Sequence, residues 1–360
     1  MEISELLIFM HKQGGSDLHI SSGVPPMIRV HGDIKKLNVP ALTQEQCHDM
    51  IYDIMNDVQQ KTFENEMDID FAISLGEIAR FRVNAFLQHR GPSAVFRIIP
   101  AKILTFKQLG LTSVFADICK YEKGVVLVTG PTGSGKSTTL AAMVDYINDT
   151  QRGHILTLED PIEFVHQTKN CLINQREVGP HTKSFSRALK GALRQDPDII
   201  LVGEMRDLET IQLALSAAET GHLVFGTLHT SSAPKTIDRI IDVFPSEEQE
   251  KVRTMLAESL KAVIAQNLLK KIGGGRVAAH EIMIGIPAIK NLIREAKIHQ
   301  IPSMIQTGTK YGMQLLDQHL KDLLMKGIVA KEEVMMKCIN PKFFDGVEGP
   351  RKKRPERRRR

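Results

Sequence analysis

The sequence predicts an α/β protein in which a small α+β domain precedes a larger domain built on a parallel-rich sheet. Beyond residue 112, short apolar runs rich in β-branched residues alternate with segments of helical character. This alternation is typical of parallel sheets, because each strand must return through a crossover before the next one begins. The expected strands of the larger domain are residues 125–129, 155–158, 199–202 and 223–227, and the expected helices include residues 186–194 and 208–219.

The small α+β domain is expected at residues 1–99. Thr43, with Gln46 three positions later, forms a capping box that predicts the start of a helix. Gly91 begins a Gly-Pro pair that is expected to turn the chain between two strands, and the second of these strands carries Arg97 inside an apolar run. The expected extended segments are residues 17–20, 27–30, 80–85 and 94–99.

The remaining parts of the chain are a linker, the larger domain and a tail. Residues 100–112 are expected to link the two domains, and residues 113–344 to form the larger one. From about residue 246 this domain is expected to be mostly helical, with a break at residues 273–275. Residues 345–360 carry the whole net charge of +5 and are expected to form a basic, disordered tail. Such a tail could instead contact anionic lipid or nucleic acid.

Composition excludes several classes of protein. No apolar run reaches the roughly 18 residues that a membrane span requires, and no signal-peptide pattern opens the chain, so a cytoplasmic protein is expected. The four cysteines lie far apart without a CxxC pair, which predicts neither a zinc site nor a disulfide framework.

A glycine-rich run follows the first expected strand of the larger domain and precedes a helix. It reads Gly130-Pro131-Thr132-Gly133-Ser134-Gly135-Lys136-Ser137 and is followed by Thr138. In this GxxxxGK[ST] pattern, backbone N–H groups surround a phosphate and the helix N-terminus adds partial positive charge. Lys136 is expected to bridge the β- and γ-phosphates, and the Ser137 hydroxyl to ligate Mg²⁺. The run predicts that the chain binds ATP with Mg²⁺.

Carboxylates follow two of the other expected strands. Residues 198–204 resemble a Walker B strand that ends in Glu204, although Gly203 stands where an aspartate usually serves the metal. Glu204 is therefore expected to act near Mg²⁺ through water. Glu159 and Glu163 follow the strand at 155–158, and either one could accept the proton of an attacking water.

Two histidines flank the expected strand at 223–227. His222 precedes this strand and His229 follows it. A histidine at a strand end is often only structural, but in a phosphate-binding protein the pair could also sense the γ-phosphate or link the nucleotide to a subunit interface.

Together these motifs resemble the type II/IV secretion ATPases. The glycine-rich loop, the acidic segment at 158–163, the Gly-Glu pair and the two histidines carry the resemblance. Residues 16–19, 191–198 and 218–222 narrow it to the branch of the family that retracts type IV pili. The resemblance runs from the N-terminus to about Phe344.

The resemblance implies a fold, an assembly and roles for site residues. Each subunit is expected to join a PAS-like domain to a RecA-like ATPase domain within a homohexameric ring that is cytoplasmic and peripheral at the inner membrane. Glu163 is implied as the general base and Glu204 as the Walker B acid. Arg82 and Arg97 are the positions implied to reach the phosphates, which would give the charge of Arg97 a partner.

The implied function is an ATPase motor for pilus retraction and twitching motility. Domain closure driven by ATP would act on the inner-membrane platform protein, which is PilC-like, while pilin is engaged only indirectly and a PilU-like ATPase is a further candidate partner. Residues 288–295 resemble a helix associated with retraction, with Lys290 where the pattern has arginine. The arginine's charge is kept there, but its planar fork is lost.

Other functions make different demands on the sequence. Extension and type II secretion ATPases usually carry an added N-terminal domain and a tetracysteine zinc site, whereas this chain begins with the small domain and has no CxxC. An accessory, PilU-like retraction ATPase stays an alternative. A RecA-like DNA translocase predicts basic or aromatic surfaces, but the body is net neutral without tryptophan, so no nucleic-acid partner is expected. A scaffold that binds ATP without hydrolysing it is a third possibility.

Overall fold

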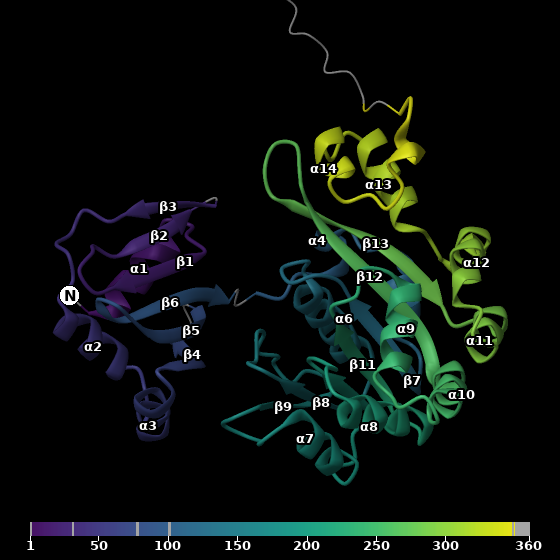
Figure 1. The fold of residues 1–360 in the computed structure, drawn as a ribbon, viewed down its shortest axis with the longest axis horizontal. Helices are drawn as coiled ribbons and strands as arrows, with labels where there is room; N and C mark the ends of the chain where they lie inside the picture. The colour runs from purple at the N-terminus through teal and green to yellow at the C-terminus, as the bar shows by residue number, and fades with distance from the viewer. Residues whose placement is uncertain (1, 31, 77–78, 100–101, 348, 350–360) are drawn as a thin grey trace, which may run out of the picture. The chain divides into compact units, whose positions relative to one another are not determined.

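The computed structural model describes residues 2–30, 32–76, 79–99, 102–347 and 349, and the chain divides into two compact units. The first unit comprises Met1–Ile103 together with the segment Pro161–Val165, and the second comprises Leu104–Asp160 and His166–Arg360. Figure 1 shows the elements of each unit. Most of the predicted tail, residue 348 and residues 350–360, lies outside the described residues.

The first unit is built on a six-stranded sheet in the order β3-β2-β1-β6-β5-β4. Each neighbouring pair of strands runs antiparallel. The strands are β1 (Asp17–Ser21), β2 (Met27–Val30), β3 (Asp33–Lys36), β4 (Asp68–Leu75), β5 (Ala79–Gln88) and β6 (Gly91–Ile99), and the helices are α1 (Ile3–Lys12), α2 (Gln44–Tyr52) and α3 (Asp57–Glu66). The four predicted extended segments all fall within these strands, so the α+β class of this unit is confirmed. The likeness to PAS domains stays a prediction.

Local chemistry accounts for these elements. Thr43 caps α2 as predicted, because its hydroxyl accepts from the Gln46 N–H at 3.1 Å while the Gln46 side chain accepts from the Thr43 N–H at 2.9 Å. Along β5, Phe81 and Val83 are fully buried and Arg82 between them is half-buried, the alternation of a sheet with one covered face. The predicted turn at Gly91 is displaced: the chain turns at residues 89–90, and Gly91 is already the first residue of β6.

The second unit contains a seven-stranded sheet in the order β13-β12-β7-β11-β10-β8-β9. All neighbouring pairs from β12 to β9 run parallel, and β13 pairs antiparallel with β12. The strands are β7 (Gly124–Thr129), β8 (His154–Glu159), β9 (Leu172–Glu177), β10 (Ile199–Val202), β11 (Leu223–Leu228), β12 (Leu260–Lys270) and β13 (Arg276–Ile284). The predicted α/β class with a parallel-rich sheet is confirmed.

Helices connect and cover this sheet. The helices of the second unit are α4 (Phe106–Leu109), α5 (Ser113–Ile118), α6 (Lys136–Thr150), α7 (Phe185–Ala192), α8 (Leu208–Glu219), α9 (Ala233–Asp242), α10 (Gln249–Ser259), α11 (Pro287–Arg294), α12 (Ile301–Thr307), α13 (Leu316–Met325) and α14 (Lys331–Met335). Short 3₁₀ helices lie at Ile298–Gln300, Thr309–Tyr311 and Pro341–Phe344. The expected linker region contains α4, whose capping box at Thr105 makes it an ordered turn of helix. Among the described residues, no helix is both long and apolar enough to cross a membrane.

The prediction that the region beyond residue 246 is mostly helical was wrong for residues 260–284. Residues 260–284 form the β12–β13 hairpin, and the three glycines at 273–275 make its turn, each with a positive φ. Glycine adopts such a backbone without steric penalty, which suits a hairpin turn. The helical prediction holds for α10 and again from α11 onward.

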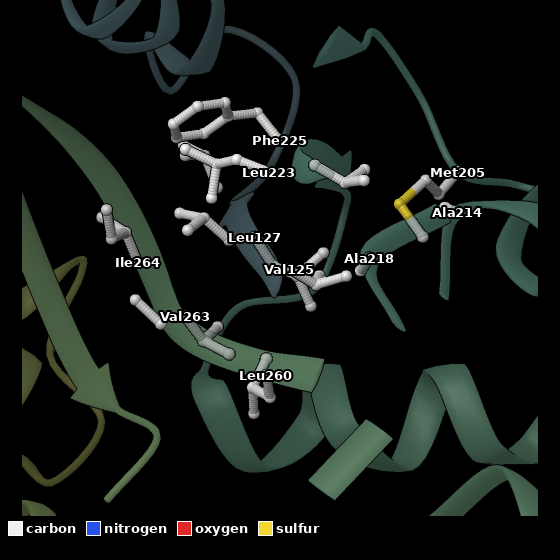
Figure 2. Packing of buried hydrophobic residues seen from close by; sticks show 14 of the residues in the cluster. Val125, Leu127, Met205, Ala214, Ala218, Leu223, Phe225, Leu260, Val263 and Ile264 are labelled. Atoms are coloured by element: carbon white, nitrogen blue, oxygen red, sulfur yellow. The ribbon is translucent and has the colours of Figure 1, made fainter. Parts of the chain in front are cut away.

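The core of the second unit lies around β7, which is buried along its whole length. Figure 2 shows Val125 and Leu127 of β7 among side chains from β11, β12 and α8. Each fully buried aliphatic side chain of this kind contributes roughly 1.5–3 kcal/mol relative to its exposed state. Because the central parallel strands are covered on both faces, their sequences are continuously apolar. A rigid sheet core therefore fixes the edge from which the loops of the candidate site arise.

Candidate nucleotide-binding site

The glycine-rich loop connects the end of β7 to the start of α6, the context that its sequence pattern predicts. Gly130, Gly133 and Gly135 have φ values of 142°, 76° and 90°. A Cβ on Gly130 would come within 2.3 Å of the Gln266 carbonyl oxygen, and one on Gly135 within 2.8 Å of the Gln266 side-chain nitrogen. Glycine is required at these two positions both by conformation and by space.

The side chains of the loop leave a cradle suited to phosphate. Lys136 Nζ donates to the carbonyl oxygens of Gly130 at 2.8 Å and Pro131 at 3.2 Å, so the ammonium lies over the loop. Ser137 and Thr138 are half-buried in the first turn of α6, whose N-cap residue supplies no side-chain hydrogen bond. The Ser134 hydroxyl is buried and has no hydrogen-bond partner among the described residues. These features fit a bound phosphate group, which would satisfy the N–H groups of the helix terminus.

Gln266 of β12 supports the loop, and sequence reasoning missed it. Its side-chain nitrogen donates to the Ser134 carbonyl at 2.7 Å, and its side-chain oxygen accepts from the Thr139 hydroxyl at 2.8 Å. Only 2% of Gln266 is exposed. No local pattern links residues 266 and 134; the contact arises because β12 lies beside β7 in the sheet.

Glu204 follows β10 at the same edge of the sheet as the loop. Strands β7, β11 and β10 are parallel neighbours, so their carboxyl ends share one edge, and β7 and β10 are two strand spacings, about 10 Å, apart. Ligands of open α/β sheets bind at this edge. The structure therefore brings the loop and Glu204 together on one edge, as the sequence motifs predict.

Met205 anchors the chain immediately after Glu204. Its N–H donates to the Thr227 carbonyl at 3.0 Å, and its side chain is buried in the core (Figure 2). A Cβ on Gly226 of β11 would lie only 2.2 Å from the Met205 sulfur. The glycine thus creates the space into which Met205 packs, and this packing fixes where Glu204 leaves the strand.

Gly203 is also explained by crowding. The Gly203 N–H donates to the Leu158 carbonyl at 2.7 Å, and the Gly203 carbonyl accepts from the Thr227 hydroxyl. A Cβ there would approach the Leu158 carbonyl oxygen to 3.0 Å and the Glu159 Cα to 3.3 Å. The absence of an aspartate at this position follows from close packing against β8.

The carboxylate of Glu204 lies between two cationic or potentially cationic groups. Its Oε1 accepts from His229 Nε2 at 2.8 Å and from the Nε of Arg206. Partial burial alone would raise the pKa of Glu204, but the hydrogen bonds and charges of Arg206 and His229 outweigh burial and lower the pKa below 4.5. Glu204 is therefore ionised at neutral pH, with 18% of its side chain exposed.

The acidic segment after β8 is divided between the two units. Glu159 ends β8, where its Oε1 accepts from the Thr157 hydroxyl at 2.6 Å and from the Gln175 amide at 3.1 Å. Glu163 is half-buried and lies in Pro161–Val165, the segment that belongs to the first unit.

The two predicted histidines lie at opposite ends of strand β11. His229 follows β11 and joins Glu204, whereas His222 precedes β11, about 20 Å away along the strand. The His222 ring contacts the Ala217 carbonyl at 3.0 Å, at the end of α8. Within one chain, the structure does not bring His222 to the edge that carries Glu204.

The two predicted arginines belong to the first unit and have partners there. Arg97 Nε donates to Asp17 Oδ1 at 2.8 Å, and Arg82 Nε lies 3.4 Å from Asp70 Oδ1. In this structure the partner of the Arg97 charge is Asp17. The Arg97 side chain is still 69% exposed.

A family model described as type II/IV secretion system protein matches residues 3–275. The type IV pilus retraction ATPase PilT of Pseudomonas aeruginosa is 63% identical, over 96% of this chain and 100% of that protein. A twitching motility protein of Neisseria gonorrhoeae is 60% identical, over 88% of this chain and 84% of that protein. A crystal structure of the pilus retraction motor PilT with bound ADP is 47% identical with a TM-score of 0.89, covering 96% of this chain and 99% of that one.

The family match covers most of the chain and the relatives align over nearly their whole lengths, so this chain belongs to the type II/IV secretion system protein family.

Proposed function

We propose that this chain is an ATPase motor that powers the retraction of type IV pili. One observation carries the proposal: a complete phosphate-binding loop and an ionised Glu204 share one sheet edge, in a chain 63% identical to a pilus retraction ATPase. We propose that this retraction drives twitching motility, the process for which the gonococcal relative is named.

Each group at the sheet edge has a chemical role in ATP hydrolysis. Lys136 and the loop N–H groups bind the β- and γ-phosphates, and Ser137 would hold Mg²⁺, which neutralises phosphate charge when bound. Glu204 would orient a water molecule of the metal's coordination shell. Mg²⁺ usually keeps several waters and binds through substrate phosphates, so it needs few ligands from the protein. Glu163 is proposed as the general base.

Domain closure supplies the remaining charges. Arg82 and Arg97 are proposed to reach the phosphates of a nucleotide held by the loop. Asp17 would keep Arg97 oriented through its Nε, and 69% of the Arg97 side chain remains exposed. Charge that arrives only on closure stabilises the transition state and couples hydrolysis to movement. His222 is proposed to act across a subunit contact, because its position excludes it from the site of its own chain.

The motor is proposed to work as a homohexameric ring at the cytoplasmic face of the inner membrane. Its direct partner would be the PilC-like platform protein, with pilin engaged only through that platform and a PilU-like ATPase as an accessory. The PAS-like character of the first unit belongs to the same proposal.

The test combines a gene deletion with purified protein. A deletion strain complemented with the wild-type gene should twitch, and the uncomplemented strain should lose twitching while keeping abundant surface pili. Bald cells would instead indicate an extension ATPase. Normal twitching with altered force would indicate an accessory ATPase. The purified wild-type chain should hydrolyse ATP, and absence of turnover would point to a nucleotide-binding scaffold.

A further inference from the structure

Gln266 of β12 contacts the phosphate-binding loop and the helix after it through both its side chain and its backbone. Both ends of its amide are used, by the Ser134 carbonyl at 2.7 Å and the Thr139 hydroxyl at 2.8 Å. The backbone carbonyl oxygen of Gln266 also lies close to Gly130: a Cβ on Gly130 would be only 2.3 Å from it. One residue of β12 therefore contacts the beginning of the loop, its middle and the first helical turns after it.

The contact with Ser134 has a directional consequence. In a planar trans peptide, the C=O of one residue and the N–H of the next point in opposite directions. When Gln266 holds the Ser134 carbonyl toward β12, the Gly135 N–H must point away from β12. Gly135 has a positive φ of 90° and precedes the first residue of α6, so its N–H belongs to the group that would face an anion.

Without Gln266, the peptide between Ser134 and Gly135 could adopt other orientations. A loop with three glycines at positive φ can reorient its peptides at little cost. A buried amide with both ends bonded is a strong constraint, because leaving either end unpaired in the interior is costly. Gln266 thus keeps one orientation of a loop that its own residues leave flexible.

We propose that Gln266 is a positioning residue for nucleotide binding, which sets the Ser134–Gly135 peptide so that the Gly135 N–H faces the phosphate. This inference rests on the proposed function, since it assumes that the loop binds a nucleotide. It adds a residue 132 positions beyond Ser134, on the first strand of the β12–β13 hairpin.

The test measures ADP affinity and ATPase kinetics of the full chain. Gln266→Met keeps the length of the side chain and removes both the amide oxygen and the amide nitrogen. Gln266→Asn keeps the amide but is one methylene too short to reach Ser134. Each variant is expected to weaken ADP binding and to raise the KM for ATP about tenfold, with kcat changed less than threefold, because ground state and transition state lose the same contact.

The control is Asn267→Ala, the next residue on the same strand, which is expected to leave ADP affinity within twofold of wild type. Urea unfolding of every variant separates a general loss of stability from a change in affinity. Wild-type affinity for ADP in folded Gln266→Met or Gln266→Asn protein would overturn the inference. Equal weakening in Asn267→Ala would overturn it as well, because the effect would then be a general property of β12. If the wild-type chain itself binds no ADP, the proposed function fails instead.

Discussion

Glu204 accepts a hydrogen bond from His229 at 2.8 Å, although the two residues follow different strands. The contact exists because β10 and β11 are parallel neighbours whose carboxyl ends emerge side by side. Arg206 binds the same carboxylate oxygen. The result is an ionised carboxylate held in one orientation at the edge that also carries the phosphate-binding loop.

Replacing Glu204 by glutamine is expected to lower steady-state ATPase activity by about 100-fold or more while preserving ADP binding. The substitution keeps the volume of the side chain and removes the charge that would orient water around Mg²⁺ beside the phosphates. Phosphate release measures the activity. Glu209→Gln is a matched control, since Glu209 is also an ion-paired carboxylate but lies exposed on α8 beside Lys190. Equal activity of the Glu204 variant and wild type would contradict the assigned role.

Replacing Gly226 by alanine is expected to destabilise the chain by about 1–3 kcal/mol and to reduce ATPase activity. The added methyl group would meet the Met205 sulfur and displace the residue that anchors Glu204. Urea unfolding and ATPase assays measure the two effects.

A double variant that combines Gly226→Ala with Met205→Ala tests whether the two residues are in direct contact. Met205→Ala alone leaves a cavity and should cost roughly 2–5 kcal/mol. Because the smaller side chain makes room for the new methyl group, the double variant should be more stable than the sum of the single effects predicts. Simple additivity would argue against the direct contact.

Stability is expected to fall with decreasing pH below about 6.5, partly because of His280. Burial, with a smaller effect from His319, lowers the pKa of His280 from 6.5 to about 3. The unfolded chain therefore binds a proton in this window that the folded chain excludes, so unfolding becomes more favourable as pH decreases, by up to ~1.4 kcal/mol per pH unit.

The variant His280→Leu should show a shallower dependence of unfolding free energy on pH between 6 and 4.5. It also loses an edge contact with Phe115, so only the slope, and not the absolute stability, is diagnostic. His299→Gln, at an exposed histidine, should keep the wild-type slope. An unchanged slope in His280→Leu would mean that this histidine titrates normally.

Lys290 links two helices of the second unit. Its Nζ donates to the Glu258 carbonyl at 3.0 Å, near the C-terminus of α10, where a positive charge is favourable. Lys290→Met should destabilise the chain by about 1 kcal/mol in urea unfolding. Lys290→Arg should be close to wild type, because a monodentate contact does not need the planar fork. Lys297→Met, which removes only an exposed ion pair with Glu295, should change stability by less than about 0.5 kcal/mol.

Local patterns were sufficient to predict the parallel strands β7, β8, β10 and β11 and the strand–loop–helix context of the glycine-rich run. The run at 199–202 matches β10 and the helix at 208–219 matches α8, because burial on both faces and a clear apolar stripe each leave a strong signal. Thr43 was found because a capping box is complete within four residues.

Features that depend on distant contacts could not be predicted in this way. The apolar run of β12 fits a buried helix as well as a buried strand, and only its pairing with β7 and β13 decides between them. Gln266 and Gly226 carry no signal of their own, since their importance comes from Ser134 and Met205. His222 and His229 look equivalent in the sequence, yet strand β11 lies between them and places them at its opposite ends.

Pilus dynamics in living cells test the central proposal most directly. In a deletion strain carrying the Glu204→Gln allele, fluorescently labelled type IV pili should extend at normal frequency and then fail to shorten, while the wild-type allele restores retraction. Pili that shorten at the wild-type rate with the Glu204→Gln allele, or that never extend, would contradict a retraction motor driven by ATP hydrolysis at this site.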